Sequence, residues 1–397
     1  MLKQIKNNVF WIGQTDWEIR QFHGHEYSTH KGTSYNSYLI REGKTVVIDT
    51  VSKPFAKDFV ANLEKELGDL NKIDYVVANH AEPDHSGALA ELMARIPGKP
   101  VYCTFAATMS LKGHYHQDWN FQVVKTGDKL DLGNGKELVF VEAPMLHWPD
   151  SMFCYLTGEN ILFSNDAFGQ HYATEFLFND LVNQEELFNE SLKYYANILT
   201  PFATFVRRKI DEFKGLNLPL DIICPSHGVI WRHEPTKIIE KYYEWAGDYR
   251  QNQITIIYDT MWGSTRLMAE EIANGIKKGD SNVEIKIYNI STGDKNDIIT
   301  EIFKSKGILV GSPTINRGIL SGVAGILEEI RGLSFKGKKA SAFGSFGWSG
   351  ESGMMIEELL KKAGMEIVKE PLKFMWNPTK EQRDICHEFG GDFSRKF

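Results

Sequence analysis

The sequence has 397 residues, of which 42% are apolar and 24% are charged, and its formal net charge is −7. This length and composition predict two or three globular domains and exclude a disordered or collagen-like chain, while the negative charge argues against nucleic acid or an anionic membrane as a partner. Because no apolar run approaches the roughly 18 residues of a membrane span and no signal peptide precedes the first strand-like segment, we expect a cytoplasmic protein.

The first half of the chain alternates short β-rich segments with occasional helical patterns. Strands are expected at residues 37–40, 45–49, 75–78, 138–141 and 160–163, and helices at residues 53–67 and 84–96. Many strands with few helices predict a β-sandwich flanked by helices. Eleven of the twelve histidines precede residue 234, so this half is expected to differ chemically from the rest.

The second half begins after a mostly polar stretch at residues 244–252, which we interpret as a linker. Five expected strands then alternate with helices. The strands fall at residues 254–258, 283–287, 307–310, 339–343 and 366–368, and the helices at residues 264–278, 297–304, 320–330 and 352–362. This alternation predicts a doubly wound α/β domain whose ligand lies at the carboxyl ends of its strands. We therefore expect one domain at residues 1–250 and another at residues 253–397.

The segment HAEPDH at residues 80–85 directly follows an expected strand. In an extended chain, residues two apart point to the same side, so His80, Glu82 and Asp84 are predicted to converge, with His85 turned to a neighbouring position. A solvated turn in which Asp84 caps a helix is the plainer alternative.

Three more candidate ligands stand where strands are expected to end, namely His147, Asp166 and His227. With the HAEPDH segment they supply four imidazoles and three carboxylates, enough for two metal ions that share one aspartate. Carboxylates are harder ligands than imidazoles and shift the preference of a site from zinc towards iron or manganese, and iron can change its redox state whereas zinc cannot. The four cysteines form no C-x-x-C pair, which argues against a disulfide framework and a cysteine-ligated metal.

A second candidate site lies in the other half, between its first strand and first helix. The hydroxyls of Thr260, Ser264 and Thr265, together with backbone N–H groups at the helix start, can bind a phosphate. Neither a Walker A lysine nor a G-x-G-x-x-G motif occurs, which favours a mononucleotide over ATP or NAD.

Two later loops, at residues 311–316 and 344–350, follow strands at the same edge of this domain. Trp262 and Trp348 can stack on a planar ring, which contributes about 0.5–1.5 kcal/mol beyond burial. Three such loops in register favour flavin mononucleotide (FMN). The residues expected to contact it are Thr260, Trp262, Gly263, Ser264, Thr265, Pro313, Thr314, Asn316, Ser345, Phe346, Gly347, Trp348 and Gly350.

The ligand spacing in the first half resembles that of the metallo-β-lactamase superfamily, whose binuclear sites use an H-x-H-x-D-H segment followed by separate His, Asp and His ligands. Glu82 stands here in place of the second histidine of that segment. Joined to a flavodoxin-like half, the pattern resembles the flavodiiron proteins (A-type flavoproteins) over essentially the whole chain. The resemblance implies a metallo-β-lactamase-like αββα sandwich followed by a flavodoxin-like domain.

The same resemblance implies an enzyme that uses two non-haem irons and FMN to reduce O2 to water, nitric oxide to nitrous oxide, or both. The implied ligands are His80, Glu82 and His147 for one iron, Asp84, His85 and His227 for the other, and Asp166 as the bridge. A pocket beside the irons would be lined by His23 and by Tyr194 or Tyr195.

Electron supply follows from the resemblance as well. The sequence ends without a rubredoxin-like C-x-x-C-G module, so an external donor is implied, either rubredoxin or a reduced deazaflavin F420. Members of the family pair head to tail, which brings the FMN of one chain beside the irons of the other, and we expect such a homodimer here. Two ferrous ions and reduced FMN together hold the four electrons that convert O2 to two waters.

Two other functions remain open on the sequence alone. The first is a zinc hydrolase of thioesterase or lactonase type with a regulatory flavodoxin domain, which would bind zinc and cleave esters without a reductant. The second is a non-catalytic electron carrier whose first half only docks a partner, and an intact diiron site would argue against it. The choice between O2 and nitric oxide is not decided by ligands that both reactions share.

Overall fold

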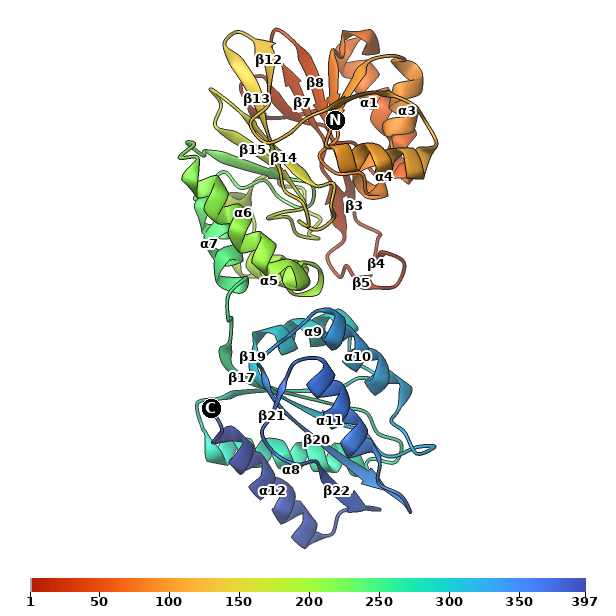
Figure 1. Cartoon of the computed structure of the whole chain (residues 1–397), viewed down its shortest axis with the longest axis vertical. Helices are drawn as coiled ribbons and strands as arrows, with labels where there is room; N and C mark the ends of the chain where they lie inside the picture. The colour runs from red at the N-terminus through yellow and green to blue at the C-terminus, as the bar shows by residue number, and fades with distance from the viewer. Residues whose placement is uncertain (1) are drawn as a thin grey trace. The chain divides into compact units, whose positions relative to one another are not determined.

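The computed structural model describes residues 2–397 and divides the chain into two compact units (Figure 1). The first unit comprises the chain up to Tyr195 together with Phe202–Gly247, and the second comprises Ala196–Pro201 and Asp248–Phe397. Helix α7 ends at Trp245 and strand β17 begins at Gln251, so the stretch between them is shorter than the linker expected at residues 244–252.

Two β-sheets face each other in the N-terminal unit. The first sheet has the order β1 (Lys3–Lys6), β2 (Val9–Trp11), β7 (Tyr38–Arg41), β8 (Thr45–Ile48), β9 (Tyr75–Val77), β10 (Pro100–Cys103) and β11 (Asn120–Val123). The second has the order β12 (Lys129–Gly133), β13 (Lys136–Glu142), β14 (Met152–Leu156), β15 (Ile161–Asn165) and β16 (Ile222–Pro225). Two small two-stranded sheets pair β3 (Gln14–Asp16) with β6 (Thr33–Tyr35) and β4 (Gln21–Phe22) with β5 (Tyr27–Ser28).

The core lies between these two sheets. Strands β14 and β15 are buried along their whole length, whereas edge strand β12 alternates apolar and polar residues. In β12, Leu130 and Leu132 are buried while Lys129 and Asp131 are exposed. One cluster of buried side chains contains residues of both sheets, for example Ile48 from the first sheet and Phe140 and Phe163 from the second. The expected sandwich is therefore confirmed.

Helices cover the outer faces of the sandwich (Figure 1). They are α1 (Ala56–Leu67), α3 (Leu89–Arg95), α4 (Phe105–Tyr115), α5 (Gln184–Tyr194), α6 (Ala203–Gly215) and α7 (Thr236–Trp245), and the short helix α2 (Pro83–Ser86) precedes α3. The single helix expected at residues 84–96 is wrong, because the chain breaks at Gly87 into α2 and α3. A Cβ at Gly87 would lie 2.3 Å from the backbone nitrogen of Lys53, so only glycine allows this close approach.

The second unit is the expected doubly wound domain. Its parallel sheet has the order β18 (Glu284–Asn289), β17 (Gln251–Tyr258), β19 (Ser305–Gly311), β20 (Lys339–Phe346) and β21 (Glu366–Ile367), with β22 (Leu372–Met375) also paired to β20. Its helices are α8 (Ser264–Gly279), α9 (Lys295–Lys304), α10 (Ser321–Gly332), α11 (Ser352–Lys362) and α12 (Lys380–Ser394). The fifth expected strand, at residues 366–368, is β21, whereas β22 is not among the expected strands and follows Pro371, which has no N–H to donate.

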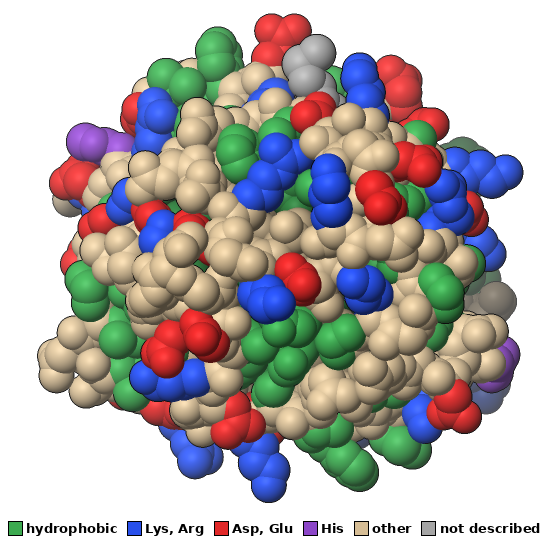
Figure 2. Space-filling model, turned by 90° about the horizontal axis from the view of Figure 1, so that it is seen from above, with side chains coloured by type: hydrophobic (Ala, Val, Ile, Leu, Met, Phe, Trp, Pro, Cys, Tyr) green, Lys and Arg blue, Asp and Glu red, His purple; other side chains and the backbone are tan. Residues whose placement is uncertain are grey.

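Surface charge is mixed on the face that Figure 2 shows, where acidic and basic side chains are interspersed. Within the described residues, no helix combines the length and the apolar character that crossing a membrane requires.

Helices α8 and α12 approach each other through glycines, and this contact yields a prediction about stability. A Cβ on Gly275 of α8 would lie 1.9 Å from the carbonyl oxygen of His387, and a Cβ on Gly390 of α12 would lie 2.0 Å from that of Ile272. Gly275→Ala should therefore lower the free energy of unfolding by about 1–3 kcal/mol, because overpacking outweighs the better helix propensity of alanine. Urea titration at constant slope measures this change.

Gly325→Ala in α10 is the matched control. Gly325 also lies inside a helix, but a Cβ there would meet no heavy atom within 4 Å. This substitution should raise the free energy of unfolding by about 0.5–1 kcal/mol. Equal effects of the two substitutions would show that the close approach of the helices does not limit stability.

Candidate functional site

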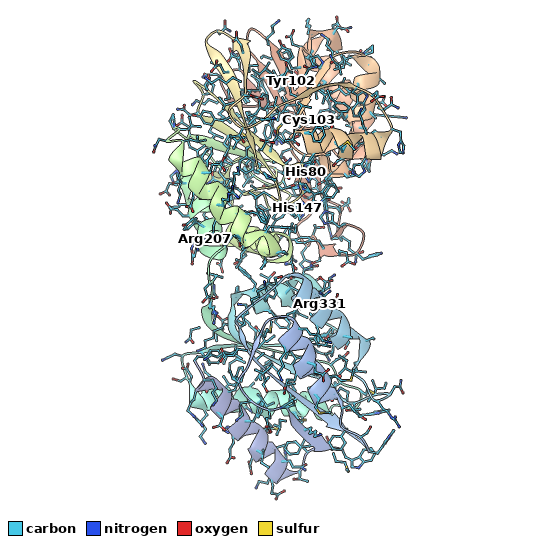
Figure 3. All side chains as sticks on the ribbon, viewed as in Figure 1. His80, Tyr102, Cys103, His147, Arg207 and Arg331 are labelled. Atoms are coloured by element: carbon cyan, nitrogen blue, oxygen red, sulfur yellow. The ribbon has the colours of Figure 1, made fainter. Side chains whose placement is uncertain are left out.

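The side chains predicted to bind metal lie together in the N-terminal unit, on the loops and the short helix α2 that follow strands β9, β13, β15 and β16. Figure 3 shows His80 and His147 beside each other in this unit, and their ring centroids are 5.5 Å apart. The full set is His80, Glu82, Asp84, His85, His147, Asp166 and His227, and all are buried or nearly so.

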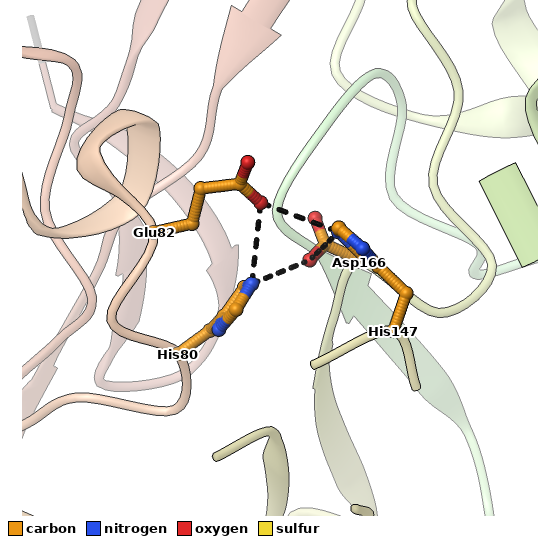
Figure 4. A group of neighbouring side chains, drawn as sticks. All are labelled: His80, Glu82, His147 and Asp166. Carbon is orange, nitrogen blue, oxygen red and sulfur yellow. Dashed lines mark hydrogen bonds and ion pairs between the residues drawn. The ribbon is translucent and has the colours of Figure 1, made fainter. Parts of the chain in front are cut away.

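The set divides into two ligand groups. We call His80, Glu82 and His147 the first ligand group, and Asp84, His85 and His227 the second ligand group. With Asp166 added to the first, the ligand atoms in each group lie within 4.8 Å of one another. Figure 4 shows how the first ligand group and Asp166 point towards a common centre.

Local structure separates the HAEPDH segment between the two groups. His80 and Glu82 precede Pro83, where helix α2 begins, while Asp84 and His85 lie within that helix. The prediction that Asp84 points the same way as His80 and Glu82 is therefore wrong, since the alternation of an extended chain ends at Pro83.

Asp166 lies between the two groups and faces both. Its Oδ2 is 3.6 Å from Nε2 of His80 and 3.5 Å from Nε2 of His147. Its Oδ1 is 2.9 Å from Nε2 of His85 and 3.5 Å from Nε2 of His227. One oxygen thus serves each group, which is the geometry of a bridging carboxylate.

Hydrogen bonds behind the rings fix which nitrogen can bind metal. Nδ1 of His227 lies 2.7 Å from the carbonyl oxygen of Ser34. A carbonyl can only accept, so Nδ1 donates and Nε2 keeps its lone pair for a metal. Nδ1 of His80 lies 3.1 Å from Oδ2 of Asp150, which leaves Nε2 of His80 in the same state. Sequence reasoning missed Asp150, although it stands only three residues after His147.

The electrostatics of the site favour ionised carboxylates. Burial disfavours the charged form of Asp166, but the surrounding imidazoles, His85 first, hold its pKa well below the ordinary value. Burial likewise opposes protonation of His85, yet Asp166 and Asp84 outweigh it and raise the pKa of His85 to about 9. The site is therefore built to hold concentrated positive charge.

The donor set fits two irons. Oδ1 of Asp84 and Oδ2 of Asp166 are buried and have no hydrogen-bond partner among the described residues. Buried carboxylate oxygens are normally satisfied, and an ion satisfies them where no donor does. Three carboxylates with four imidazoles suit iron better than zinc.

Of the three other residues expected near the irons, His23 and Tyr194 lie beside metal ligands and Tyr195 does not. Nε2 of His23 lies 3.0 Å from Oε1 of Glu82, within the site. The buried ring of Tyr194 lies 6.2 Å from that of His227, measured between centroids. Tyr195 instead packs against Tyr242 at 5.1 Å. Of the two tyrosines left open by the sequence, Tyr194 is the one on the side of the metal ligands.

A cavity of about 440 Å³ lies at the carboxyl ends of the strands in the second unit, where doubly wound domains bind ligands. The residues expected to contact FMN that line it are Thr260, Trp262, Ser264, Pro313, Thr314, Asn316, Ser345, Phe346, Gly347 and Trp348. Thr265 lies beneath it, with its hydroxyl 3.2 Å from that of Ser345. Gly263, at φ +89°, shapes the turn before α8, and Gly350 packs near Phe346. These three do not line the cavity.

Sequence reasoning missed part of the cavity wall, made by Met261, Arg317, Ser349 and Trp376. Trp376 directly follows β22, which is not among the strands expected from the sequence. A correct prediction of β22 would have indicated this fourth loop, because its strand ends at the same edge as the other three.

Two family models match the chain. Residues 33–228 match the model described as "ODP family beta lactamase", and residues 256–389 match the model of flavodoxin. These segments hold the two ligand groups and the cavity, respectively.

The chain is also similar to characterised proteins over nearly its whole length. It is 56% identical over 394 residues to the anaerobic nitric oxide reductase flavorubredoxin of Escherichia coli, covering 99% of this chain and 82% of that protein. Among solved structures, it is 35% identical to the rubredoxin oxygen:oxidoreductase of Desulfovibrio gigas, with a TM-score of 0.96 over 100% of this chain and 98% of that chain. It is 32% identical to the flavodiiron protein of Giardia intestinalis, with a TM-score of 0.94 over 100% and 96% of the two chains.

Proposed function

This chain belongs to the flavodiiron proteins. We propose that the metal ligands of this oxidoreductase are the two ligand groups bridged by Asp166. We also propose that nitric oxide is its preferred substrate. The family reduces nitric oxide or O2 with a diiron centre and FMN. The observation that carries the assignment is Asp166, whose two oxygens face different ligand groups. Nitric oxide is placed first because the relative that is 56% identical is named for its reduction. O2 is the second candidate, since the Desulfovibrio gigas protein is named for oxygen.

The bound irons and FMN supply the electrons, and the residues of the chain hold and surround them. His23 is proposed to donate to Oε1 of Glu82 and so to orient this carboxylate. Burial raises the pKa of Tyr194 well above its ordinary value, so its hydroxyl stays protonated and can donate a hydrogen bond beside His227. Thr260 and Ser264, at the start of α8, are proposed to hold the FMN phosphate.

The proposed substrate is tested by mixing the anaerobically reduced enzyme with nitric oxide and, separately, with O2 in a stopped-flow instrument. Reoxidation of FMN by nitric oxide with formation of one nitrous oxide per two nitric oxide molecules is the expected result. Faster and complete reoxidation by O2 alone would make O2 the substrate. Zinc in place of iron, with ester hydrolysis in the absence of a reductant, would favour the hydrolase instead.

The electron donor is proposed to be rubredoxin, because the Desulfovibrio gigas relative is named for it, with a reduced deazaflavin as the alternative. The exposed indole of Trp262 at the flavin cavity supports docking of a protein there. Trp262 is 91% exposed and lines the cavity. Large exposed aromatic side chains around a pocket are typical of a surface that another protein covers.

We also propose a head-to-tail homodimer in which Trp348 of one chain lies near the irons of the other. Twofold dimers are the commonest soluble assembly, and an isologous interface uses one surface twice. The test mixes Asp166→Ala, which lacks an intact diiron site, with Ser264→Glu, purified without bound FMN, and lets the subunits exchange. Mixed dimers should regain about one active site of two. Confirmed exchange without recovery of nitric oxide or O2 reduction would place electron transfer within one chain.

A further inference from the structure

Three histidines of the metal centre differ in what lies behind their rings. Nδ1 of His80 faces the carboxylate of Asp150 at 3.1 Å, and both side chains are fully buried. Nδ1 of His227 faces a neutral backbone carbonyl, that of Ser34, at 2.7 Å. Nδ1 of His85 is buried and has no hydrogen-bond partner among the described residues. A charged acceptor therefore stands behind only one of these three rings.

Asp150 is held firmly in this position. Its Oδ2 accepts the backbone N–H of Ala81 at 2.7 Å in addition to the His80 bond. The hydroxyl of Thr104, which caps helix α4, donates to the backbone carbonyl of Asp150 at 3.0 Å. The loop between β13 and β14 carries both Asp150 and the ligand His147. One loop thus supplies a ligand to the first ligand group and the carboxylate that orients another.

We propose that Asp150 is a positioning residue that makes the two metal positions unequal. Its charge strengthens His80 as a ligand, so the iron in the first ligand group is held more tightly and is oxidised at a lower potential than the iron in the second. A carboxylate behind a ligand imidazole raises the basicity of that imidazole, and a nearby negative charge stabilises the ferric over the ferrous ion. This inference rests on the diiron assignment above.

The test is Asp150→Asn in the full-length holoenzyme. An asparagine oxygen can still accept the N–H groups of His80 and Ala81, so the substitution removes the charge and keeps the shape. A redox titration followed by Mössbauer spectroscopy should show one of the two iron reduction steps moving upward by about 60 mV, which corresponds to a tenfold change for a one-electron couple. A chelator should release one of the two irons about tenfold faster than from the wild type.

Two further variants separate charge from structure. Glu159→Gln removes a different buried carboxylate of the same unit, one that pairs with Lys136 and contacts no metal ligand. It should leave both readouts at wild-type values. Asp150→Glu keeps the charge and should keep the potential. If Asp150→Asn folds poorly, Asp150→Ser removes the same charge and should raise the same reduction step, and an unchanged potential in Asp150→Ser would overturn the proposal.

The outcomes distinguish this inference from the proposed function. Two irons in the wild type with unchanged potential and release in Asp150→Asn would overturn the role of Asp150 alone. A potential shift in Asp150→Glu as large as that in Asp150→Asn would assign the effect to geometry and overturn the role of charge. Wild-type protein that binds zinc in place of iron would overturn the diiron assignment itself.

Discussion

Asp166→Ala is expected to reduce the iron content from two per chain to one or none and to lower nitric oxide reduction by more than about 100-fold. The substitution removes both oxygens that face the two ligand groups, one directed at His80 and His147 and the other at His85 and His227. It also removes one of three carboxylates that balance the charge of the metals. Iron analysis of the purified protein and a nitric oxide electrode measure the two effects.

Asp180→Ala is the control for Asp166→Ala. Asp180 belongs to the same unit but forms a surface ion pair with Arg232, 2.8 Å apart, away from the ligands. This variant should keep two irons and full activity. FMN content should stay unchanged in both variants, because the flavin cavity lies in the other unit. Two fully occupied irons in Asp166→Ala would refute the bridge.

Ser264→Glu is expected to weaken FMN binding by about 100-fold or more, while the iron content stays at two per chain. Ser264 is the first residue of α8 and lines the flavin cavity. A glutamate there suits the positive end of the helix, so the fold should be preserved. Its carboxylate, however, competes with and repels the dianionic phosphate in a partly buried cavity. Fluorescence titration of the apoprotein with FMN gives the dissociation constant.

Ser321→Glu makes the same change at the first residue of α10, which lies outside the cavity. The dissociation constant for FMN should then stay within about twofold of the wild type, the scale of a screened surface charge. Equal weakening by both substitutions would mean that the effect comes from net charge, and the phosphate would have to bind elsewhere.

The two fold classes and the chemistry of both sites follow from the order and type of the residues. Many short β-rich segments with few helices predicted the sandwich, and strands that alternate regularly with helices predicted the doubly wound domain; both are confirmed. The predicted ligands lie together because loops after strands bring reactive side chains to one edge of a sheet. Glu82 in the place of a histidine indicated iron from residue type alone, since ligand hardness does not depend on the fold.

The division of these residues between the two ligand groups, and the contacts that support them, could be seen only in the folded chain. Helix α2 begins at Pro83 and directs Asp84 towards His85 and His227 of the second ligand group. The two-residue period of a strand does not predict this direction. Tyr194 and Tyr195 are neighbours in sequence, but successive residues of a helix point about 100° apart, and packing places only Tyr194 beside His227. Asp150 lies behind His80 across 70 residues of chain, and no local pattern encodes a contact between segments that meet only after the two sheets have packed.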